Sequence, residues 1–365
     1  MLFRSGFGTF RVQLFTVNGD AVNDAQSDLI PFDDESFLDE QGIGVFSDAS
    51  GAPRVMRLAH RQLDFYTPGA QGTFVPDVMP LKTTSDGADH ATMGADGTFA
   101  ASVGIADQSY LAVRTPAGSW TTMPTTLAIE QMVLDLENRL YQASLGSQEF
   151  FYRIGNAAQS TRVPIRSGAS SLEPIQMAVA GPSLPTPSPP VLSFLSRDAY
   201  GLDVMVPNSN QVYVELTAGG YTRTCNPPNP GPSQCTTAVC NDLGESPVTH
   251  ALTRAEDGTV WLAYLSKAVD RGVTLRVATF FFDYCETDRI SPHPGDGTLQ
   301  LVLSRIVPGN PPKIEERYRA PVGASDPTSQ PSSFTNFSSR GSELHLVIPT
   351  GKNQLRRLVF DTRRL

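Results

Sequence analysis

The chain has 365 residues, of which 40% are hydrophobic and 18% are charged, and its formal net charge is -9. This composition excludes an intrinsically disordered chain, and the negative charge argues against nucleic acid as the main partner, because phosphate binding needs a basic face. The sequence lacks the run of about 18 apolar residues that a transmembrane helix requires, so no membrane span is expected.

The N-terminal sequence MLFRSGFGTF lacks the apolar core of a signal peptide. The chain is therefore expected either to begin after a cleaved signal or to carry an added Met1. Residues Thr9–Val17 alternate partly between apolar and polar and predict a strand. The acidic segment that follows predicts a solvated connection, with calcium binding as the alternative and no other cofactor expected. Its carboxylates are Asp28, Asp33, Asp34, Glu35, Asp39 and Glu40.

A repeated unit follows, made of an apolar strand, a turn, a second strand and a third strand that opens with an aliphatic residue. The clearest copy is His250–Thr279, with a tight turn at Asp257–Gly258. The other turns are expected at 48–51, 96–97, 198–201 and 340–341, and a sixth has Asn138, which tolerates left-handed backbone nearly as well as glycine. The expected third strands are 63–67, 111–115, 212–214, 275–279 and 355–358.

The spacing of these turns predicts a β-propeller. The shorter steps, from 51 to 97 and from 97 to 138, match the roughly 40–50 residues of a four-stranded blade. We therefore predict an all-β fold with a single propeller domain over residues 1–365, six-bladed, with seven blades as the alternative. The longer steps contain expected insertions at about 181–190, 222–247 and 284–312, with an extra hairpin or a long outer strand in the last. The final unit ends after its third strand, so Thr9–Val17 is expected to pair with it and close the ring.

The cysteines predict two disulfides and an oxidising compartment, because an even number of them clusters in and beside one proline-rich loop. They are Cys225, Cys235, Cys240 and Cys285. A zinc site is the alternative, although no Cys-x-x-Cys pair is present and no metal is expected. Of three connectivities, the sequence favours Cys225–Cys235, which closes a small loop, together with Cys240–Cys285.

Two segments, DHATMGADGTFAASVGIADQSYLAVRTPAGSW (89–120) and VTHALTRAEDGTVWLAYL (248–265), resemble the degenerate blades of exported bacterial propellers. They are similar to Asp-box, sialidase-like and regulator-type repeats. The resemblance covers roughly two thirds of the chain and implies blades rather than an activity. It implies that Asp96 and Asp257 tie their hairpins. The arginine triad, Tyr-Glu pair and acidic residue of sialidases cannot be placed, and the segment Tyr152–Gly155 lacks the proline of their Arg-Ile-Pro sequence.

Two of the five histidines, His90 and His250, precede the turn glycine by seven or eight residues and are each followed by alanine. They are expected on innermost strands, where a structural role is favoured over proton transfer or metal binding. The remaining histidines are His60, His293 and His345. The aromatic residues that could stack on sugars are expected instead to cover blade junctions; they are Tyr66, Tyr110, Trp120 and Tyr213.

The sequence contains no nucleophile elbow, phosphate-binding loop or His-Glu-x-x-His motif. The leading hypothesis is a non-catalytic binding or assembly propeller that presents its loops to a protein or glycan at the cell envelope. Its location is expected to be extracytoplasmic, in the periplasm, on the cell surface or secreted. The alternative is an extracytoplasmic lyase or hydrolase that uses His90 and His250 near the central channel. A third interpretation is a subunit of a larger surface assembly.

Overall fold

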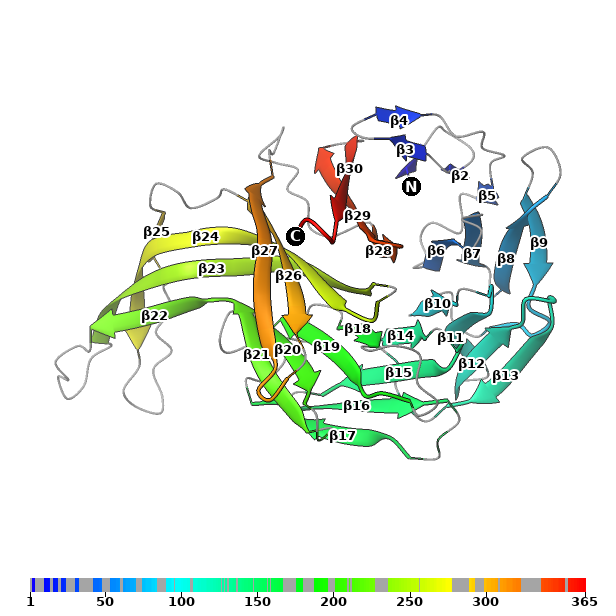
Figure 1. Cartoon of the computed structure of the whole chain (residues 1–365), viewed down its shortest axis with the longest axis horizontal. Helices are drawn as coiled ribbons and strands as arrows, with labels where there is room; N and C mark the ends of the chain where they lie inside the picture. Colours follow the sequence, from blue (N-terminus) through cyan, green and yellow to red (C-terminus); the bar gives the residue numbers. More distant parts are fainter. Residues whose placement is uncertain are drawn as a thin grey trace.

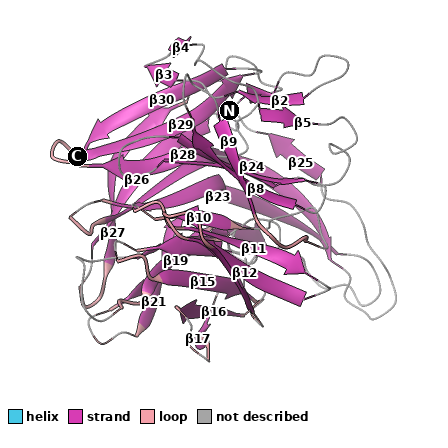
Figure 2. Cartoon of the chain, turned by 90° about the vertical axis from the view of Figure 1, so that its right-hand side faces the viewer, coloured by secondary structure: helices cyan, strands magenta, loops and turns pink. Residues whose placement is uncertain are grey.

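The structure is a computed structural model that describes the chain in segments between residues 2 and 365. The longer stretches outside the described residues are 4–9, 24–29, 33–41, 48–52, 84–89, 167–174, 180–186, 196–200, 227–235, 278–288, 293–298 and 323–335. Every regular element in the described part is a strand (Figure 2), and none of these residues forms a helix long and apolar enough to cross a membrane.

The described strands form a six-bladed β-propeller (Figure 1), as the turn spacing predicted. Blades 1 to 4 are four-stranded antiparallel sheets whose strands follow the order of the chain. Blade 1 is β6 (Gly42–Ser47), β7 (Pro53–Ala59), β8 (Gln62–Pro68) and β9 (Phe74–Val78). Blade 2 is β10 (Ala91–Met93), β11 (Phe99–Ile105), β12 (Gln108–Arg114) and β13 (Trp120–Pro124). Blade 3 is β14 (Gln131–Leu134), β15 (Leu140–Leu145), β16 (Glu149–Ile154) and β17 (Thr161–Pro164). Blade 4 is β18 (Gln176–Val179), β19 (Pro190–Leu195), β20 (Leu202–Pro207) and β21 (Tyr213–Gly219).

Blade 5 contains two strands that run far beyond the propeller body. Its four strands are β23 (Thr236–Arg254), β24 (Val260–Val277), β26 (Leu299–Val307) and β27 (Lys313–Pro321). Two short strands, β22 (Tyr221–Asn226) and β25 (Arg289–Pro292), pair with the outer parts of β23 and β24. We call β22, β25 and residues 236–245 and 268–277 the arm, which extends to the left in Figure 1.

The arm corrects three strand assignments in this blade. Residues 275–277, expected in a third strand, are the far end of β24, which pairs with β23 along almost its whole length. The third strand of the blade is β26 and the fourth is β27. The insertion predicted over 284–312 depended on a loop expected after Leu265. In the structure the polar residues after Leu265 stay extended, because they pair with the other strands of the arm. Only the part before Leu299 lies outside the four-stranded blade.

Blade 6 has three described strands, β28 (Asn336–Arg340), β29 (Glu343–Gly351) and β30 (Gln354–Asp361). The expected N-terminal strand is divided in two. Its first part lies in a small sheet of β1 (Leu2–Phe3), β2 (Phe10–Gln13) and β5 (Ile30–Phe32). Its second part, β3 (Thr16–Asn18), forms a hairpin with β4 (Ala21–Asn23) and lies against β30 (Figure 1). The segment thus lies beside the last blade, while the backbone pairing described for β3 is with β4.

The first strand of each blade lies innermost. Successive first strands are in contact from blade 1 to blade 6, in the order β6, β10, β14, β18, β23 and β28. The apolar cores lie between neighbouring sheets. At the junction of blades 3 and 4, for example, Tyr141 and Phe150 pack with Leu192 and Phe194. Radial packing of this kind buries both faces of each sheet.

Four of the six predicted turns adopt the expected left-handed backbone. The φ angles are 90° at Gly97, 59° at Asn138, 85° at Gly258 and 56° at Gly341. Asp96 and Asp257 tie their hairpins, because Asp96 Oδ1 accepts a hydrogen bond from the Thr98 amide at 2.8 Å and Asp257 Oδ1 accepts one from the Thr259 amide at 2.9 Å. The turn at 48–51 lies outside the described residues. The expected turn at Gly201 instead precedes β20, the third strand of blade 4. Residues 213 and 214, expected in the third strand, open the fourth strand β21, and Val212 precedes it.

Candidate functional site

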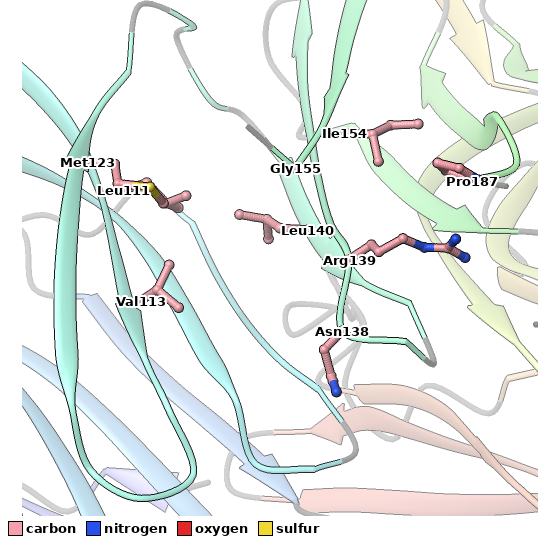
Figure 3. A pocket seen from close by; sticks show the side chains of 9 residues that line it. All are labelled: Leu111, Val113, Met123, Asn138, Arg139, Leu140, Ile154, Gly155 and Pro187. Atoms are coloured by element: carbon pink, nitrogen blue, oxygen red, sulfur yellow. The ribbon is translucent and has the colours of Figure 1, made fainter. Parts of the chain in front are cut away.

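A pocket of about 400 Å³ lies at the junction of blades 2 and 3, at the end where the turns β14–β15 and β16–β17 lie. Proline 187, from the expected insertion at 181–190, also lines it (Figure 3). The lining residues are Leu111, Val113, Met123, Asn138, Arg139, Leu140, Ile154, Gly155 and Pro187. The pocket therefore combines two blade faces with a segment that the sequence marked as an insertion.

Strand alternation places the apolar lining. Leu111 and Val113 are two residues apart in β12, so they share one face of blade 2, and Met123 lies opposite Leu111 in β13. Leu140 opens β15 in the next blade and packs with this group. The sheets meet tightly near Leu111 and Leu140, both of which are buried, and Val113 and Met123 are only partly covered. The pocket is the part of this junction that the two blades leave open.

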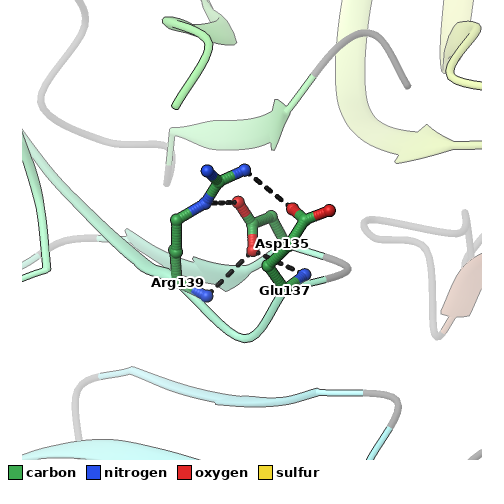
Figure 4. A network of polar contacts seen from close by, with 3 residues as sticks. All are labelled: Asp135, Glu137 and Arg139. Carbon is green, nitrogen blue, oxygen red and sulfur yellow. Dashed lines mark hydrogen bonds and ion pairs between the residues drawn. The ribbon is translucent and has the colours of Figure 1, made fainter. Parts of the chain in front are cut away.

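Among the described residues that line the pocket, Arg139 is the only charged one, and two carboxylates balance it (Figure 4). Its Nε donates to Asp135 Oδ2 at 2.6 Å, and its terminal nitrogen lies 2.7 Å from Glu137 Oε2. Asp135 Oδ1 also accepts hydrogen bonds from the backbone amides of Glu137 and Arg139 at 3.0 and 2.8 Å. The hydrogen bond to Asp135 raises the pKa of Arg139. The charge of the guanidinium is thus balanced by carboxylates of its own turn.

Asn138 joins the turns of blades 2 and 3 beside the pocket. Its side-chain Oδ1 is buried, and a Cβ added to Gly94 would lie 2.3 Å from it. Because residue 94 is a glycine, the side-chain amide of Asn138 can contact the turn between β10 and β11 of blade 2 directly. This contact fixes the spacing of the two turns at the end of the junction where the pocket lies.

A buried polar group crosses the same junction away from the turns. The Arg153 guanidinium donates to Thr125 Oγ1 at 2.7 Å and to Gln142 Oε1 at 2.6 Å. Burial lowers the pKa of Arg153. These hydrogen bonds tie β16 to the chain just after β13, across the blade 2–blade 3 junction.

The described lining of the pocket is mostly apolar. Among the nine described lining residues, none is a serine, threonine, cysteine, histidine, tyrosine or carboxylate. A nucleophile needs an adjacent base, and an acid or base needs a titratable side chain within hydrogen-bond reach. The described lining therefore offers an apolar surface with one arginine and one amide side chain.

His250 lies at another junction, between blades 4 and 5. It is 5% exposed, and its Nε2 lies 3.1 Å from the backbone oxygen of Ser193 in β19, so Nε2 carries the proton and donates. Burial lowers the pKa of His250 to about 4. Among the described residues, its buried Nδ1 has no hydrogen-bond partner. The imidazole is neutral and buried, and its hydrogen bond connects β23 of blade 5 to β19 of blade 4.

His90 and His250 both lie at inner strands, as expected, but they are one residue out of register. His90 precedes the turn residue Gly94 by four positions, and His250 precedes the equivalent residue Ala255 by five; the amides of Gly94 and Ala255 bond to the oxygens of Thr98 and Thr259 at 2.8 Å each. Because side chains alternate along a strand, the two histidines point to opposite faces of their blades. The structure does not bring them together.

The remaining histidines either contact residues of their own blade or lie outside the described part. His345 contacts Arg357 and Glu343 within blade 6, and His60 and His293 are outside the described residues. No cluster of His, Cys, Asp or Glu among the described residues could hold a metal ion. The side chains of the acidic segment 28–40 are not described, nor are those of the cysteines. Cys225 and Cys240 lie in the described strands β22 and β23.

Two of the aromatic residues that could have stacked on sugars, Trp120 and Tyr213, cover blade junctions, as the sequence favoured. Trp120 of blade 2 donates from Nε1 to Asp77 Oδ1 of blade 1 at 3.2 Å. Tyr213 of blade 4 packs edge-on against Phe150 of blade 3, with ring centroids 5.2 Å apart. Tyr66 is buried and Tyr110 is half-buried.

Comparisons with known proteins place no family name on the chain. No family model and no curated protein matches it. Solved structures align over most of its length. A streptogramin B lyase is 12% identical, covers 88% of this chain and 94% of its own, and has a TM-score of 0.36. A putative gluconolactonase is 11% identical, with 88% and 96% covered and a TM-score of 0.35. A luciferin-regenerating enzyme is 10% identical, with 88% and 92% covered and a TM-score of 0.34.

Likenesses this distant carry no argument about activity. The predicted propeller is confirmed by the blades, and the similarity to Asp-box and sialidase-like repeats stays a prediction.

Proposed function

We propose that this protein is a non-catalytic binding propeller, acting outside the cytoplasm, and that its pocket between blades 2 and 3 accepts an apolar side chain of a partner protein. The observation that carries the proposal is the lining of the pocket. Apolar side chains from two blades and Pro187 line the described part of the pocket, and the one charged residue among them, Arg139, is balanced within its own turn.

The same lining favours a protein over a glycan. Sugar hydroxyls must keep their hydrogen bonds when they leave water, and an unsatisfied buried hydroxyl costs about 1–3 kcal/mol. In the described lining, the polar side chains are Arg139, which bonds to Asp135 and Glu137, and Asn138, whose oxygen is buried against Gly94. An apolar side chain needs no such partners and gains about 25 cal/mol for each Å² that it buries.

The location outside the cytoplasm rests on the cysteines. Four of them lie in or beside the arm and its loop, and disulfide-forming clusters persist in oxidising compartments. The arm projects from the propeller and presents two of the expected insertions. Loops and extensions on a rigid scaffold suit a binding role.

The test is capture of the partner from the native envelope, with the whole chain as bait and a pocket variant beside it. Val113→Lys places a charge in the partly open lining and is expected to reduce capture by about ten-fold or more, because an apolar group would then meet an ammonium. Val359→Lys is the matched control, since Val359 is 47% exposed in blade 6. Equal melting temperatures of the two variants show that both fold.

Two results would contradict the proposal. Equal capture by both variants would show that the pocket does not take part in partner binding. Turnover of a glycan or cyclic ester that disappears when His90 and His250 are both replaced by Gln would establish the enzyme alternative.

A further inference from the structure

The register of the arm places two cysteines side by side. In the antiparallel pair β22–β23, the partner of Cys225 is Cys240. The pairs on either side of them, Thr224 with Asn241 and Asn226 with Val239, continue the same ladder without a shift. Cys225 and Cys240 are therefore a directly opposed cross-strand pair in the middle of a regular stretch.

Opposed residues in an antiparallel ladder have Cα atoms about 4.5–5.5 Å apart and share one face of the sheet. Disulfides join cysteines whose Cα atoms are about 4.4–6.8 Å apart. The backbone thus holds Cys225 and Cys240 at bridging distance with no movement.

The same strand argues against the pairing that the sequence favoured. Residues from Thr236 to Cys240 are extended in β23, so Thr236 is about 13 Å along the strand from the position opposite Cys225. Cys235 is the next residue, and consecutive Cα atoms are about 3.8 Å apart, which leaves it about 9 Å or more from Cys225. That distance exceeds the roughly 7 Å that a disulfide tolerates.

We propose that Cys225 and Cys240 form a disulfide that fastens the edge strand β22 to β23. Cys235 and Cys285, which lie outside the described residues, are then the two cysteines left to form the second. Thr236, the neighbour of Cys235, is opposite Val277 at the end of β24, and Cys285 follows Val277 by eight residues. Each bond forms when two thiols lose two electrons and two protons to a disulfide-bearing oxidant, which is reduced to two thiols through a mixed disulfide. The connectivity is independent of what the pocket binds.

The test identifies which thiol each single substitution sets free. The whole chain, secreted into an oxidising compartment, is denatured without reductant, labelled with N-ethylmaleimide and digested with trypsin for mass spectrometry. Cys225→Ser is expected to yield a label on Cys240, and Cys235→Ser a label on Cys285. Cleavage after Arg223 and Arg254 places three of the cysteines in one peptide, so fragment ions locate the label.

Two double variants separate native pairing from reshuffling. Cys235→Ser with Cys285→Ser is expected to stay unlabelled, because the opposed pair remains. Cys240→Ser with Cys285→Ser is the matched control, which keeps Cys225 and Cys235 and is expected to take two labels. If a variant fails to fold, fragmentation of the cross-linked peptides from the unaltered chain gives the connectivity directly. A label on Cys235 or Cys285 in Cys225→Ser, or four labels on the unaltered chain, would overturn the proposal.

Discussion

At the scale of single residues, His250 shows how a polar group is used inside a blade junction. Its Nε2 proton binds the backbone oxygen of Ser193, and its position in β23 lets one imidazole link two sheets. The folded protein holds this ring neutral, with a pKa of about 4, whereas an exposed histidine has a pKa of about 6.5.

This difference predicts a pH dependence of stability. Below about pH 6.5 the unfolded chain binds a proton at this histidine that the folded chain does not, so the stabilisation is complete above pH 6.5 and is lost as the pH falls toward 4. The loss amounts to about 3 kcal/mol, at about 1.4 kcal/mol for each pH unit. Chemical unfolding at pH 7 and pH 4 should show that wild type loses about this much more than His250→Gln. Parallel profiles for the two proteins would mean that folding does not lower the pKa of His250.

Single residues also show where sequence reasoning succeeds. The left-handed turn at Asn138 could be predicted because few side chains other than Gly, Asn and Asp accept such a backbone. The opposed faces of His90 and His250 could not be seen from a seven- or eight-residue spacing, since one residue of register reverses the face. Arg139 was missed as a site residue, although the turn sequence Asp135-Leu136-Glu137-Asn138-Arg139 already pairs an arginine with two carboxylates.

At the scale of elements, neighbouring blades are held by more than apolar packing. Asp77 at the outer strand of blade 1 binds Arg114 Nε of blade 2 at 2.6 Å and also accepts from Trp120. The Arg114 guanidinium lies 4.8 Å from the centre of the Phe65 ring. One carboxylate therefore organises a cation and two aromatic side chains across the junction.

Removing this carboxylate is expected to be costly. Asp77→Ala leaves Arg114, whose side chain is 9% exposed, without its anion. We expect a loss of about 2–3 kcal/mol in the free energy of unfolding, somewhat less than for a fully buried pair because Asp77 itself is partly exposed. Arg162→Ala, which breaks an ion pair whose arginine is 71% exposed, serves as the control and should cost less than about 1 kcal/mol. Equal losses in urea denaturation of both variants would show that burial does not set the cost.

Strands were predicted well where one blade follows the common pattern and poorly where distant segments pair. The third strands of blades 1 and 2 follow from their alternation. Residues 266–273 read as a loop because they mix polar residues with glycine, yet β23 and β25 hold them in a ladder. The pocket could not be predicted from the sequence either, because Leu111 and Val113 line it only when blade 3 packs against blade 2.

At the scale of the whole molecule, the ring brings its two ends together at blade 6. β3 lies against β30, and blade 6 has three strands among its described residues. Deleting residues 1–18 should lower the melting temperature by a few degrees, since a loss of about 2–3 kcal/mol is expected and each kcal/mol corresponds to about 1–2 °C in a chain of this length. Deleting only residues 1–8, which spares β3, is the control for calorimetry. An unchanged melting temperature, or the same fall in both deletions, would show that β3 does not stabilise the closure of the ring.

The arm has a further consequence for anyone who wishes to engineer this scaffold. In space it is one module, but along the chain it comprises two segments, one on each side of the β23–β24 hairpin. Exchanging 222–247 alone would leave residues 268–277 of β24 with an open backbone edge, a template for intermolecular association. An excision that leaves no open edge must remove both segments. It must join β21 to the part of β23 that remains in blade 5, and the remaining part of β24 to β26. Conversely, a foreign hairpin can be grafted at these two junctions as a single rigid extension of the propeller.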